Sequence, residues 1–524
     1  MKKNESIFLE QIYACLPRLL SFFDRDRWSG FKGVGDRQYT AWCFLDFANG
    51  TYQGAAHGLA RLLKADLLPE WCAADKVAAL IEDIFRGTDK IIRSNGSLEE
   101  SFPNEGSFCV TALAAHDLLW AHQLLPAQTP EISRSRLQTI SRMIEFLLRA
   151  DERHGFISNH LATATGALYH WHSITGDKRA EKRGAVFLQR ILANASAEGW
   201  FSEYGSPDPG YQTLCQHYLE LLDSFRPDLG LQGYLNAGNR FLSRFALPDG
   251  SFGGVYGGRR TGLYYPSGVI LRSEACAEAA ALAYFMENSI RRRACVTLAA
   301  MDDANLIPMF NAYAVAAEYA ALRKTPPLGK TLPCLDISFQ HQDFPDAGLM
   351  LRGTAEHYTI ISTRLGGAYE SCSRDGTRHV IDGGSIVHKG RKIWSTQVPD
   401  AAAQLREEND AIILESRPAR LLRTRPTPVH FIILRLLGLT VLRLPGAGDV
   451  IKRMMAYFLM DRRTYLPLRI RRSIDLSGSL AVTRGEVLDP LPPKCVFQAN
   501  GGYFRSIHMA SAGYWPAEGT GRAN

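Results

Sequence analysis

The stretch Asp249-Gly250-Ser251-Phe252 belongs to a series of six turn-rich segments that recur along the N-terminal part of the chain. Their central residues are Gly50, Gly106, Gly155, Gly199, Gly250 and Asp303. The steps between these residues are 56, 49, 44, 51 and 53 positions. A recurrence near 50 residues is typical of one supersecondary unit that is used repeatedly.

Each repeating unit has the pattern of a helix, a turn and a second helix. Segments before the turns show amphipathic helical spacing, whereas several segments after them are apolar on all sides, as in Glu274–Ala283. We expect helices before the turns at 76–92, 133–150, 182–195 and 232–247, and after them at 110–125, 161–175, 211–225, 274–290 and 311–324. Six such hairpins, each with one exposed and one buried helix, predict a closed (α/α) toroid over residues 1–325.

The pattern changes after Lys324, where prolines mark a linker at 326–343. Short alternating stretches such as His357–Thr363 then predict an antiparallel, sandwich-like β domain at 344–510, followed by a flexible tail at 511–524. The predicted fold class is therefore α+β and multidomain, with the (α/α) toroid of helical hairpins first and the antiparallel β-sheet domain second.

Positive charge is concentrated in an insertion of the β domain. Residues 417–472 hold thirteen Lys or Arg and two acids, although the whole chain carries a net charge of only +7. Within them, Val429–Leu444 is an apolar run that contains Arg435 and Arg443, and it is too short and too charged for a good transmembrane span.

This run predicts either a strand or helix packed in the sheet domain, or an interfacial segment that dips into a membrane with its arginines at the headgroups. The sequence shows no nucleic-acid-binding module, so nucleic acid is not an expected partner. An acidic oligo- or polysaccharide, or an anionic membrane surface, suits the charge instead.

The ten cysteines form no Cys-x-x-Cys pair, and most lie in apolar helical patterns. We therefore expect neither a metal site nor a disulfide framework, and no cofactor. The first 27 residues lack the pattern of a signal peptide, because Glu10 interrupts the apolar stretch and no small-residue cleavage site follows. The expected location is the cytoplasm, with peripheral contact at the inner face of the membrane as an extension of the interfacial interpretation.

The segment Ser158–Ala164 places Asn159 and His160 at the start of a predicted buried helix. Their side chains add hydrogen-bond donors to the free backbone N–H groups of the first helical turn. This combination suits the binding of a carboxylate or another anion. The alternative is that Asn159 only caps the helix and His160 only packs.

The loop Glu198–Thr213 is rich in groups that transfer protons or bind sugar. Its substrate-binding candidates are Trp200, Glu203, Tyr204 and Asp208, and Tyr211 at its end is a candidate for proton transfer. Its aromatic side chains are of the kind that stack on pyranose faces. Asp208, which precedes Pro209 and Gly210, is also typical of a helix cap.

Glu105, Arg259 and Arg260 complete the candidate substrate-binding set. Glu105 lies in the turn 103–108, and four glycines surround the two arginines within 249–265. Because no lysine–hydroxyl pair follows these glycines, the segment predicts a mobile basic lip of the cleft rather than a phosphate-binding loop.

Three segments of the sequence resemble the heparinase II/III-like and alginate-lyase-like polysaccharide lyases. They are Ser158–Ala164, the tyrosine-bearing loop Gly199–Tyr211, and Phe344–Arg352, which is similar to the opening of the family's β-sheet domain. The resemblance covers residues 100–400 and implies β-elimination in a uronic-acid polymer. In that reaction a base removes the C5 proton, the glycosidic oxygen at C4 leaves, and the uronate charge must be neutralised.

Carried over, the resemblance implies that Asn159 and His160 are catalytic and contact the carboxylate and the reacting sugar. It implies that Tyr211 exchanges protons with the sugar. The family's histidine-rich strand segment corresponds here to Tyr369–Gly376, so that either His379 or His388 would have to compensate. Lyases that meet external polymers are commonly exported, so the missing signal-peptide pattern is a second departure from the family.

Two other functions remain open from the sequence. A toroid glycoside hydrolase or a uronate epimerase would draw its carboxylates from Glu105, Glu203 and Asp208. A non-catalytic glycan-binding protein in surface-polysaccharide biosynthesis would fit the missing histidine segment. The joint presence of Asn159, His160 and Tyr211 favours an enzyme.

Overall fold

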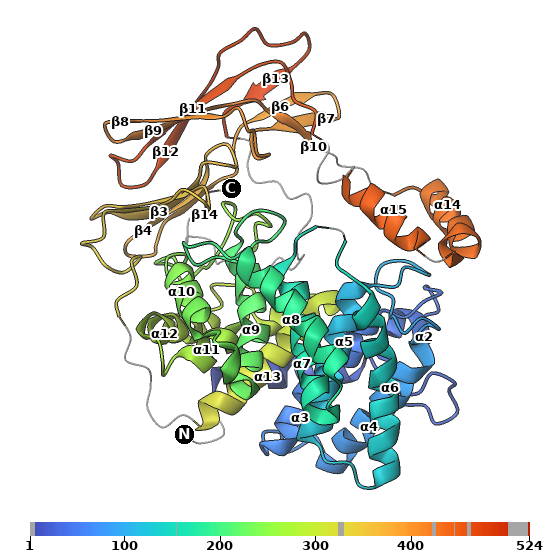
Figure 1. Cartoon of the computed structure of the whole chain (residues 1–524). Coiled ribbons are helices and arrows are strands. Elements are labelled where there is room, and N and C mark those ends of the chain that lie inside the picture. Colours follow the sequence, from blue (N-terminus) through green and yellow to red (C-terminus); the bar gives the residue numbers. More distant parts are fainter. Residues whose placement is uncertain are drawn as a thin grey trace.

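The structure, a computed structural model of the 524-residue chain, describes residues 6–153, 155–322, 330–421, 426–444, 446–457, 463–500 and 522–523. Helices occupy its N-terminal part and mainly antiparallel sheets its C-terminal part (Figure 1). The last helix of the first part ends at Leu322, and the first strand begins at His341. The predicted α+β class is confirmed at this level.

The α-helices of the first part are α1 (Ile7–Leu20), α2 (Arg37–Thr40), α3 (Ala55–Lys64), α4 (Ala74–Ile91), α5 (Phe108–Leu124), α6 (Pro130–Arg149), α7 (Ser158–Thr175), α8 (Lys178–Ala193), α9 (Pro209–Phe225), α10 (Gln232–Leu242), α11 (Pro266–Arg272), α12 (Ala277–Arg292) and α13 (Leu306–Leu322). Several pairs of consecutive helices in this part contact each other and are joined by short connections, such as residues 176–177 between α7 and α8.

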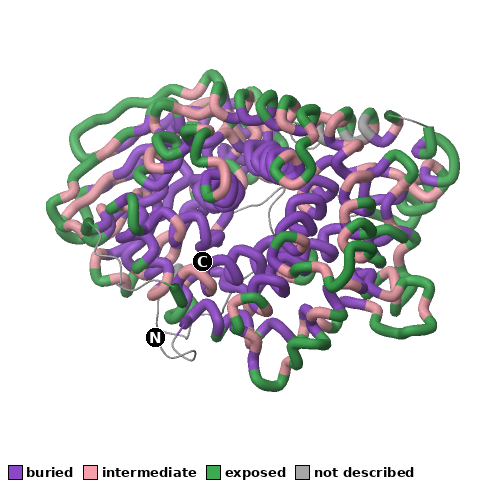
Figure 2. Tube along the Cα trace, turned by 60° about the horizontal axis from the view of Figure 1, so that its bottom comes forward, coloured by how far each residue is buried: buried purple, intermediate pink, exposed green. Residues whose placement is uncertain are grey.

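Alternate helices contact one another in a succession that returns to its start. α3 contacts α5, α5 contacts α7, α7 contacts α9, α9 contacts α11, α11 contacts α13, and α13 contacts α3. These six inner helices pack respectively against the outer helices α4, α6, α8, α10, α12 and α1. Figure 2 shows buried residues gathered around the middle of this part and exposed residues at its rim.

The difference between inner and outer helices follows from their sequences. In α5, every residue from Ala114 to Ala121 is buried, so the helix is enclosed on all sides. In the outer helix α6 burial is confined to a stripe that includes Ile140, Met143, Ile144 and Leu147. This three- and four-residue spacing places one face of α6 against the inner helices.

One predicted helix lies in the other layer. The alanine-rich segment 274–290, expected to be an inner helix, is the outer helix α12, which contacts α1, α10 and α11. The inner position belongs to α11, whose seven residues are too few to show a clear period. Small side chains indicate close packing but not its direction, and Tyr284 of α12 is exposed.

The described residues of the C-terminal part form three sheets. The first contains β1 (His341–Phe344), β2 (Leu349–Gly353), β3 (His357–Ser362), β4 (Ala368–Ser373), β5 (His379–Asp382) and β14 (Arg522–Ala523), in that order. The second has the order β10 (Ala419–Leu421), β7 (Lys392–Ser395), β6 (Ile386–Lys389) and β13 (Val496–Gln498). The third has the order β12 (Val482–Val487), β11 (Ile470–Asp475), β9 (Ala411–Ser416) and β8 (Gln404–Glu408).

Two strands fall outside the predicted β domain. Most of β1 lies in the stretch expected to be a linker. This stretch forms a strand there because it pairs with β2, with Phe344 opposite Leu349. β14 lies in the stretch expected to be a flexible tail, and it is the one described strand that pairs in parallel, with Arg522 opposite His379. The other paired strands are antiparallel, as the alternating pattern predicts.

The first sheet is covered on both faces. Leu349 and Leu351 of β2 join the core of the helical part, whereas Met350 between them packs with Ile412 and Leu414 of β9. Because successive strand residues point to opposite faces of a sheet, this alternation determines which face meets the helices. The sheet therefore rests directly on the helical part and holds its loops in place.

Helices also interrupt the sheets, within the predicted basic insertion. α14 (Pro428–Leu439), a short 3-10 turn at Val441–Arg443 and α15 (Ala447–Ala456) lie between β10 and β11 in the chain. Figure 1 shows α14 and α15 apart from the sheets, over the end of the helical part that carries α2. The interpretation of 429–444 as an element packed in the sheet domain is therefore wrong. Among the described residues, no helix is both long and apolar enough to cross a bilayer.

Candidate functional site

Two side chains from separate segments, Asn159 and Arg259, donate to one buried carboxylate, that of Glu203, and Arg259 links Tyr211 to it. Asn159, in the first turn of α7, donates from Nδ2 to Oε2 of Glu203 at 2.9 Å. Arg259, in the loop after α10, donates from Nη1 to Oε1 at 2.9 Å. Nη2 of Arg259 also donates to the hydroxyl of Tyr211, in the first turn of α9, at 3.1 Å. We call Asn159, Glu203, Tyr211 and Arg259 the Glu203 cluster.

A tight turn aims Glu203 at the start of α7. Its backbone N–H donates to the carbonyl oxygen of Ser206 at 2.9 Å, and a bridge joins it to Ile157, the residue before α7. Tyr204 has φ of 53° and Gly205 has φ of 78°, so the chain reverses through the left-handed region. Gly205 adopts this conformation without a steric cost, because it has no Cβ.

Burial raises the pKa of Glu203 to about 7, against the opposing effects of Arg259 and of His160. A carboxyl group with this pKa exchanges a proton near neutral pH, which is the condition for efficient general acid–base catalysis. Both of its oxygens accept hydrogen bonds, from Asn159 and Arg259. The cluster therefore combines a proton acceptor with two donors that stabilise negative charge.

Tyr211 lies against a cation, the guanidinium of Arg259. The guanidinium of Arg259 lies 4.4 Å from the ring centroid of Tyr211 and 5.1 Å from that of Tyr204. Burial nevertheless raises the pKa of Tyr211 well above its usual value, with Arg259 acting in the opposite direction. The hydroxyl is therefore protonated at neutral pH and suits a proton donor.

His160 lies beside the cluster and pairs elsewhere. Its Nδ1 is 2.7 Å from Oε2 of Glu152, a carboxylate that follows α6. Burial opposes the charged ring, but the contacts with Cys109 and Glu152 outweigh it and raise the pKa of His160 well above 6.5. His160 thus supplies positive charge next to Asn159. Neither Glu152 nor Cys109 was a candidate from the sequence, because no motif marks them.

Asp208 is a helix cap. Its Oδ1 accepts from the backbone N–H of Tyr211 at 3.1 Å, and its Oδ2 accepts from that of Arg259 at 2.8 Å. Thr261 N–H points to the same Oδ2 at 3.4 Å. Asp208 therefore joins the start of α9 to the loop 243–265, which carries Arg259 and Arg260 and which we call the arginine loop. Both buried oxygens of Asp208 accept hydrogen bonds from backbone N–H groups.

Three other predicted residues lie away from the Glu203 cluster. Trp200 is buried and donates to Oε2 of Glu198 at 3.1 Å. Oε2 of Glu105 accepts from the backbone of its own turn, at 2.6 Å from Ser101. Arg260 donates to the carbonyl oxygen of Gln397 at 2.9 Å and so joins the arginine loop to the sheets.

His379, one of the two histidines that the resemblance made relevant, supports the arginine loop from β5. Its Nδ1 is 2.9 Å from Oδ2 of Asp249, and its Nε2 is 3.2 Å from Oε2 of Glu370. Glu370 in turn accepts from the backbone N–H of Val255 at 2.9 Å. His379 thus contacts the loop that carries Arg259 through Asp249, and it reaches Val255 of the same loop through Glu370. His388 lies on β6, in the second sheet.

A second polar cluster lies among the inner helices and tests the expectation of no metal site. Nδ1 of His57 and Nδ1 of His116 are 3.0 and 3.2 Å from Oδ1 of Asp117, close enough to share an ion. However, Nε2 of His57 accepts from Arg61 at 2.8 Å, and Nε2 of His116 accepts from Trp120 at 3.3 Å.

Arg61 and Trp120 are donors only, so both Nε2 atoms must be unprotonated and both Nδ1 atoms carry the ring hydrogen. A metal ion bound at Nδ1 would require the opposite tautomer. Burial lowers the pKa of both histidines to about 3, which agrees with neutral rings that donate to Asp117. The three residues form a hydrogen-bonded core and do not fit a metal.

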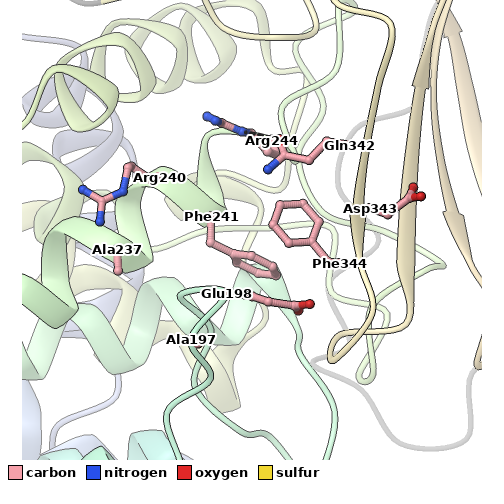
Figure 3. Close-up of a pocket in the computed structure, with 9 residues that line it drawn as sticks. All are labelled: Ala197, Glu198, Ala237, Arg240, Phe241, Arg244, Gln342, Asp343 and Phe344. Carbon is pink, nitrogen blue, oxygen red and sulfur yellow. Dashed lines mark hydrogen bonds between the residues drawn. The ribbon is translucent and has the colours of Figure 1, made fainter.

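A pocket of about 360 Å³ lies at the junction of α10 and β1, and Figure 3 shows the residues that line it. Phe241 and Phe344 meet edge-to-face in it, with ring centroids 5.1 Å apart. Its charged lining residues are two arginines and two acids: Arg240, Arg244, Glu198 and Asp343. The pocket shares no lining residue with the Glu203 cluster and has no excess of one charge.

No protein-family model matches the sequence, and no curated protein matches it either.

Proposed function

We propose that this protein is a polysaccharide lyase of the heparinase II/III-like kind, which cleaves an acidic, uronate-containing glycan by β-elimination. The observation that carries the proposal is that Asn159 and Arg259 both donate to Glu203 while Arg259 also donates to Tyr211, so that residues from separate segments form one hydrogen-bonded unit. The sequence motifs nominated all four residues. Their hydrogen bonding into one unit supports a shared chemical task.

The chemistry assigns a role to each group. The carboxylate of Glu203, whose pKa is about 7, accepts the C5 proton of the uronate. The electron pair of that C–H bond becomes the C4–C5 double bond, and the C4–O bond breaks with its pair on the glycosidic oxygen. Tyr211 donates its hydroxyl proton to this leaving oxygen. Overall, one proton moves from C5 to the leaving group, and solvent exchange restores both side chains.

Negative charge that develops on the uronate needs donors and cations. Arg259 and Asn159 supply fixed donors in a buried setting, where electrostatic stabilisation is strongest. His160, with its raised pKa, adds positive charge one residue after Asn159. His160, Tyr204 and Arg259 are partly exposed, so they form the side of the cluster that faces solvent.

The architecture supports the same proposal. We infer that the helical part is an (α/α) toroid, because its inner helices contact one another in a succession that returns from α13 to α3. Asn159 and Tyr211 begin neighbouring inner helices, so the repeat itself brings them to the same end of that succession.

The test is a screen of uronate-containing polymers with the purified full-length chain. A lyase produces a C4–C5 double bond, which absorbs ultraviolet light, together with one new reducing end per cleavage. Absorbance that grows in step with reducing ends supports the proposal. Reducing ends without ultraviolet absorbance would instead identify a hydrolase, and binding without either product would identify a glycan-binding protein.

The raised pKa of Glu203 also favours a second candidate, a glycoside hydrolase, since such enzymes need a carboxylic acid that is protonated near neutral pH. Its second carboxylate would have to be other than Asp208 and Glu105, whose oxygens accept backbone N–H groups. Glu152, which pairs with His160 at the edge of the cluster, is the acid that remains nearby.

A further inference from the structure

α14 is apolar on nearly every side and yet is exposed. Its side chains that are 50–61% exposed are Val429, Phe431, Ile432, Ile433, Leu436 and Leu439. A helix that is apolar all round is normally buried in a protein core or in lipid. The exposure of these side chains therefore indicates that a further surface covers α14.

The apolar surface continues beyond α14. Leu444, Val450 and Met454, after the 3-10 turn and in α15, are 54–62% exposed. We call residues 426–444 and 446–457 the apolar arm. Single exposed apolar residues are common on proteins, but a contiguous group of this size marks an interaction site.

The apolar arm is attached to the helical part by polar contacts and close packing. Asn104 donates from Nδ2 to the carbonyl oxygen of Gly438 at 2.9 Å. Arg435 pairs with Asp46 at 2.9 Å. A Cβ at Gly448 would lie 2.9 Å from the carbonyl oxygen of Glu105, so α15 approaches that turn closely. The exposed face is therefore held in a defined orientation.

The contact with Asp46 places the arm next to an exposed aromatic pair. Trp42 and Phe44 stack with ring centroids 6.1 Å apart and are both more than half exposed. Tryptophan is enriched where a protein meets the interface between water and lipid. Apolar residues of the arm and this aromatic pair thus lie close in sequence to the two ends of the Arg435–Asp46 ion pair.

The charge around the apolar side chains is positive. Arg443 and Arg453 are exposed on the arm itself. The sequence of the arm holds four Lys or Arg, at positions 435, 443, 452 and 453, against one acid, at position 449. An apolar helix flanked by cations matches the interface of a bilayer that carries anionic lipids.

The length of α14 determines how it can meet such a bilayer. Its 12 residues span roughly 18 Å at about 1.5 Å per residue, whereas a hydrocarbon core is about 30 Å thick. The helix is therefore suited to lie along the surface and not to cross it.

We propose that the apolar arm, together with Trp42 and Phe44, is a docking surface for a bilayer with anionic headgroups. α14 lies in the headgroup region with its apolar side chains toward the acyl chains, and the arginines contact phosphate groups. This inference is independent of the proposed lyase activity, because it rests on residues outside the Glu203 cluster.

The experiment is co-sedimentation of the full-length chain with vesicles of phosphatidylcholine, with and without phosphatidylglycerol. Binding should be strong only with phosphatidylglycerol, and it should weaken as salt rises because exposed charges are screened. Equal binding to neutral vesicles, or binding to neither kind, would overturn the proposal.

Variants separate the apolar contribution from the charge. Ile432→Ser with Leu436→Ser should lower the partition coefficient by roughly tenfold or more, because both side chains lose their transfer into lipid. Arg443→Gln should lower it roughly fivefold, the contribution of one basic residue near an anionic surface. Arg435 is less informative, since it already pairs with Asp46.

The matched control is Val186→Ser with Lys182→Gln on the outer helix α8, where both side chains are exposed. It should leave vesicle binding unchanged. A wild-type dimer that the Ile432→Ser, Leu436→Ser variant converts to monomer would show instead that the arm joins two copies of the chain. Retention of vesicle binding by that variant would also overturn the proposal.

Discussion

Arg259 serves several partners with one guanidinium: the carboxylate of Glu203, the hydroxyl of Tyr211 and the faces of two tyrosine rings. Arginine suits this position because its planar fork donates in several directions and stacks on aromatic faces at the same time. From the sequence, Arg259 was expected on a basic lip of the cleft and not as a partner of Tyr211. Which cation reaches a tyrosine depends on packing, and repeat spacing alone does not reveal it.

Tyr211→Phe tests the proton donor, because it removes the hydroxyl and leaves the ring against Arg259. We expect activity on the polymer found in the screen to fall roughly 10²–10⁴-fold, the usual contribution of a general acid. Binding of that polymer should change little. Tyr284→Phe, which removes a hydroxyl from the exposed face of α12, is the control. Full activity in Tyr211→Phe would exclude this residue from the proton transfer.

Glu203→Gln tests the base through pH dependence. Because the pKa of Glu203 is raised to about 7, the wild-type kcat/KM should increase as pH rises through about 7, where the carboxylate form takes over. The Gln variant should be far slower and should lack this limb, whereas Glu131→Gln, on the exposed first turn of α6, should retain it. Wild-type activity that decreases above pH 7 would instead assign Glu203 the role of an acid and favour the hydrolase.

At the scale of elements, the start of α9 connects helix stability with the site. The cap Asp208 holds both Tyr211 and the backbone of Arg259, two members of the Glu203 cluster. The sequence offered two interpretations of Asp208, and the structure confirms the helix cap. Pro209 and Gly210 made the cap predictable, because proline is favoured in the first helical turn.

Asp208→Ala should lower the free energy of unfolding by at least about 2 kcal/mol. The loss of a cap costs about 1 kcal/mol, and each buried N–H left without an acceptor adds roughly 1–3 kcal/mol. Denaturant unfolding measures the difference. Thr129→Ala, at the more exposed cap of α6, is the matched control and should cost about 1 kcal/mol or less. Equal losses in the two variants would show that Asp208 does no more than an ordinary cap.

Elements differed in how far their sequences revealed them. Long helices such as α6 and α8 were predictable, because their apolar stripe and their length agree. The short inner helices α3 and α11 were not, since ten and seven residues give little periodicity. For α14 the sequence left two positions open, because an apolar run predicts burial whether the covering surface is protein or lipid.

At the scale of the whole molecule, His379 joins the two parts of the chain. It lies on β5 and pairs with Asp249, in the loop after α10, and with Glu370 on β4. The order of the sheets and this contact could not be read from the sequence, because pairing between distant strands leaves no local pattern. Only the alternation within each strand was predictable.

His379 should make stability depend on pH. Its contacts with Asp249 and Glu370 outweigh burial and raise its pKa to about 9, against an ordinary value of 6.5. A raised folded-state pKa gives stability that is complete below about 6.5 and is lost as pH rises through about 9. The melting temperature of the wild type should therefore fall more steeply over this range than that of His379→Gln. His388→Gln on β6 should follow the wild type, and parallel curves for His379→Gln would contradict this origin.

The contacts between α13 and the first helices have a consequence for the order of synthesis. Arg18 of α1 donates to the carbonyl oxygen of Met301, and the backbone N–H of Gly58 in α3 donates to Asn311 of α13. A chain emerging from the ribosome must therefore expose the apolar sides of α1 and α3 until more than 300 residues have been made. Because such distant contacts form late, the nascent N-terminal half depends on protection from aggregation. The proximity of α1 to α13 also makes this part suited to circular permutation. New termini at an outer turn would shorten the time during which α1 and α3 remain without their partners in the sequence.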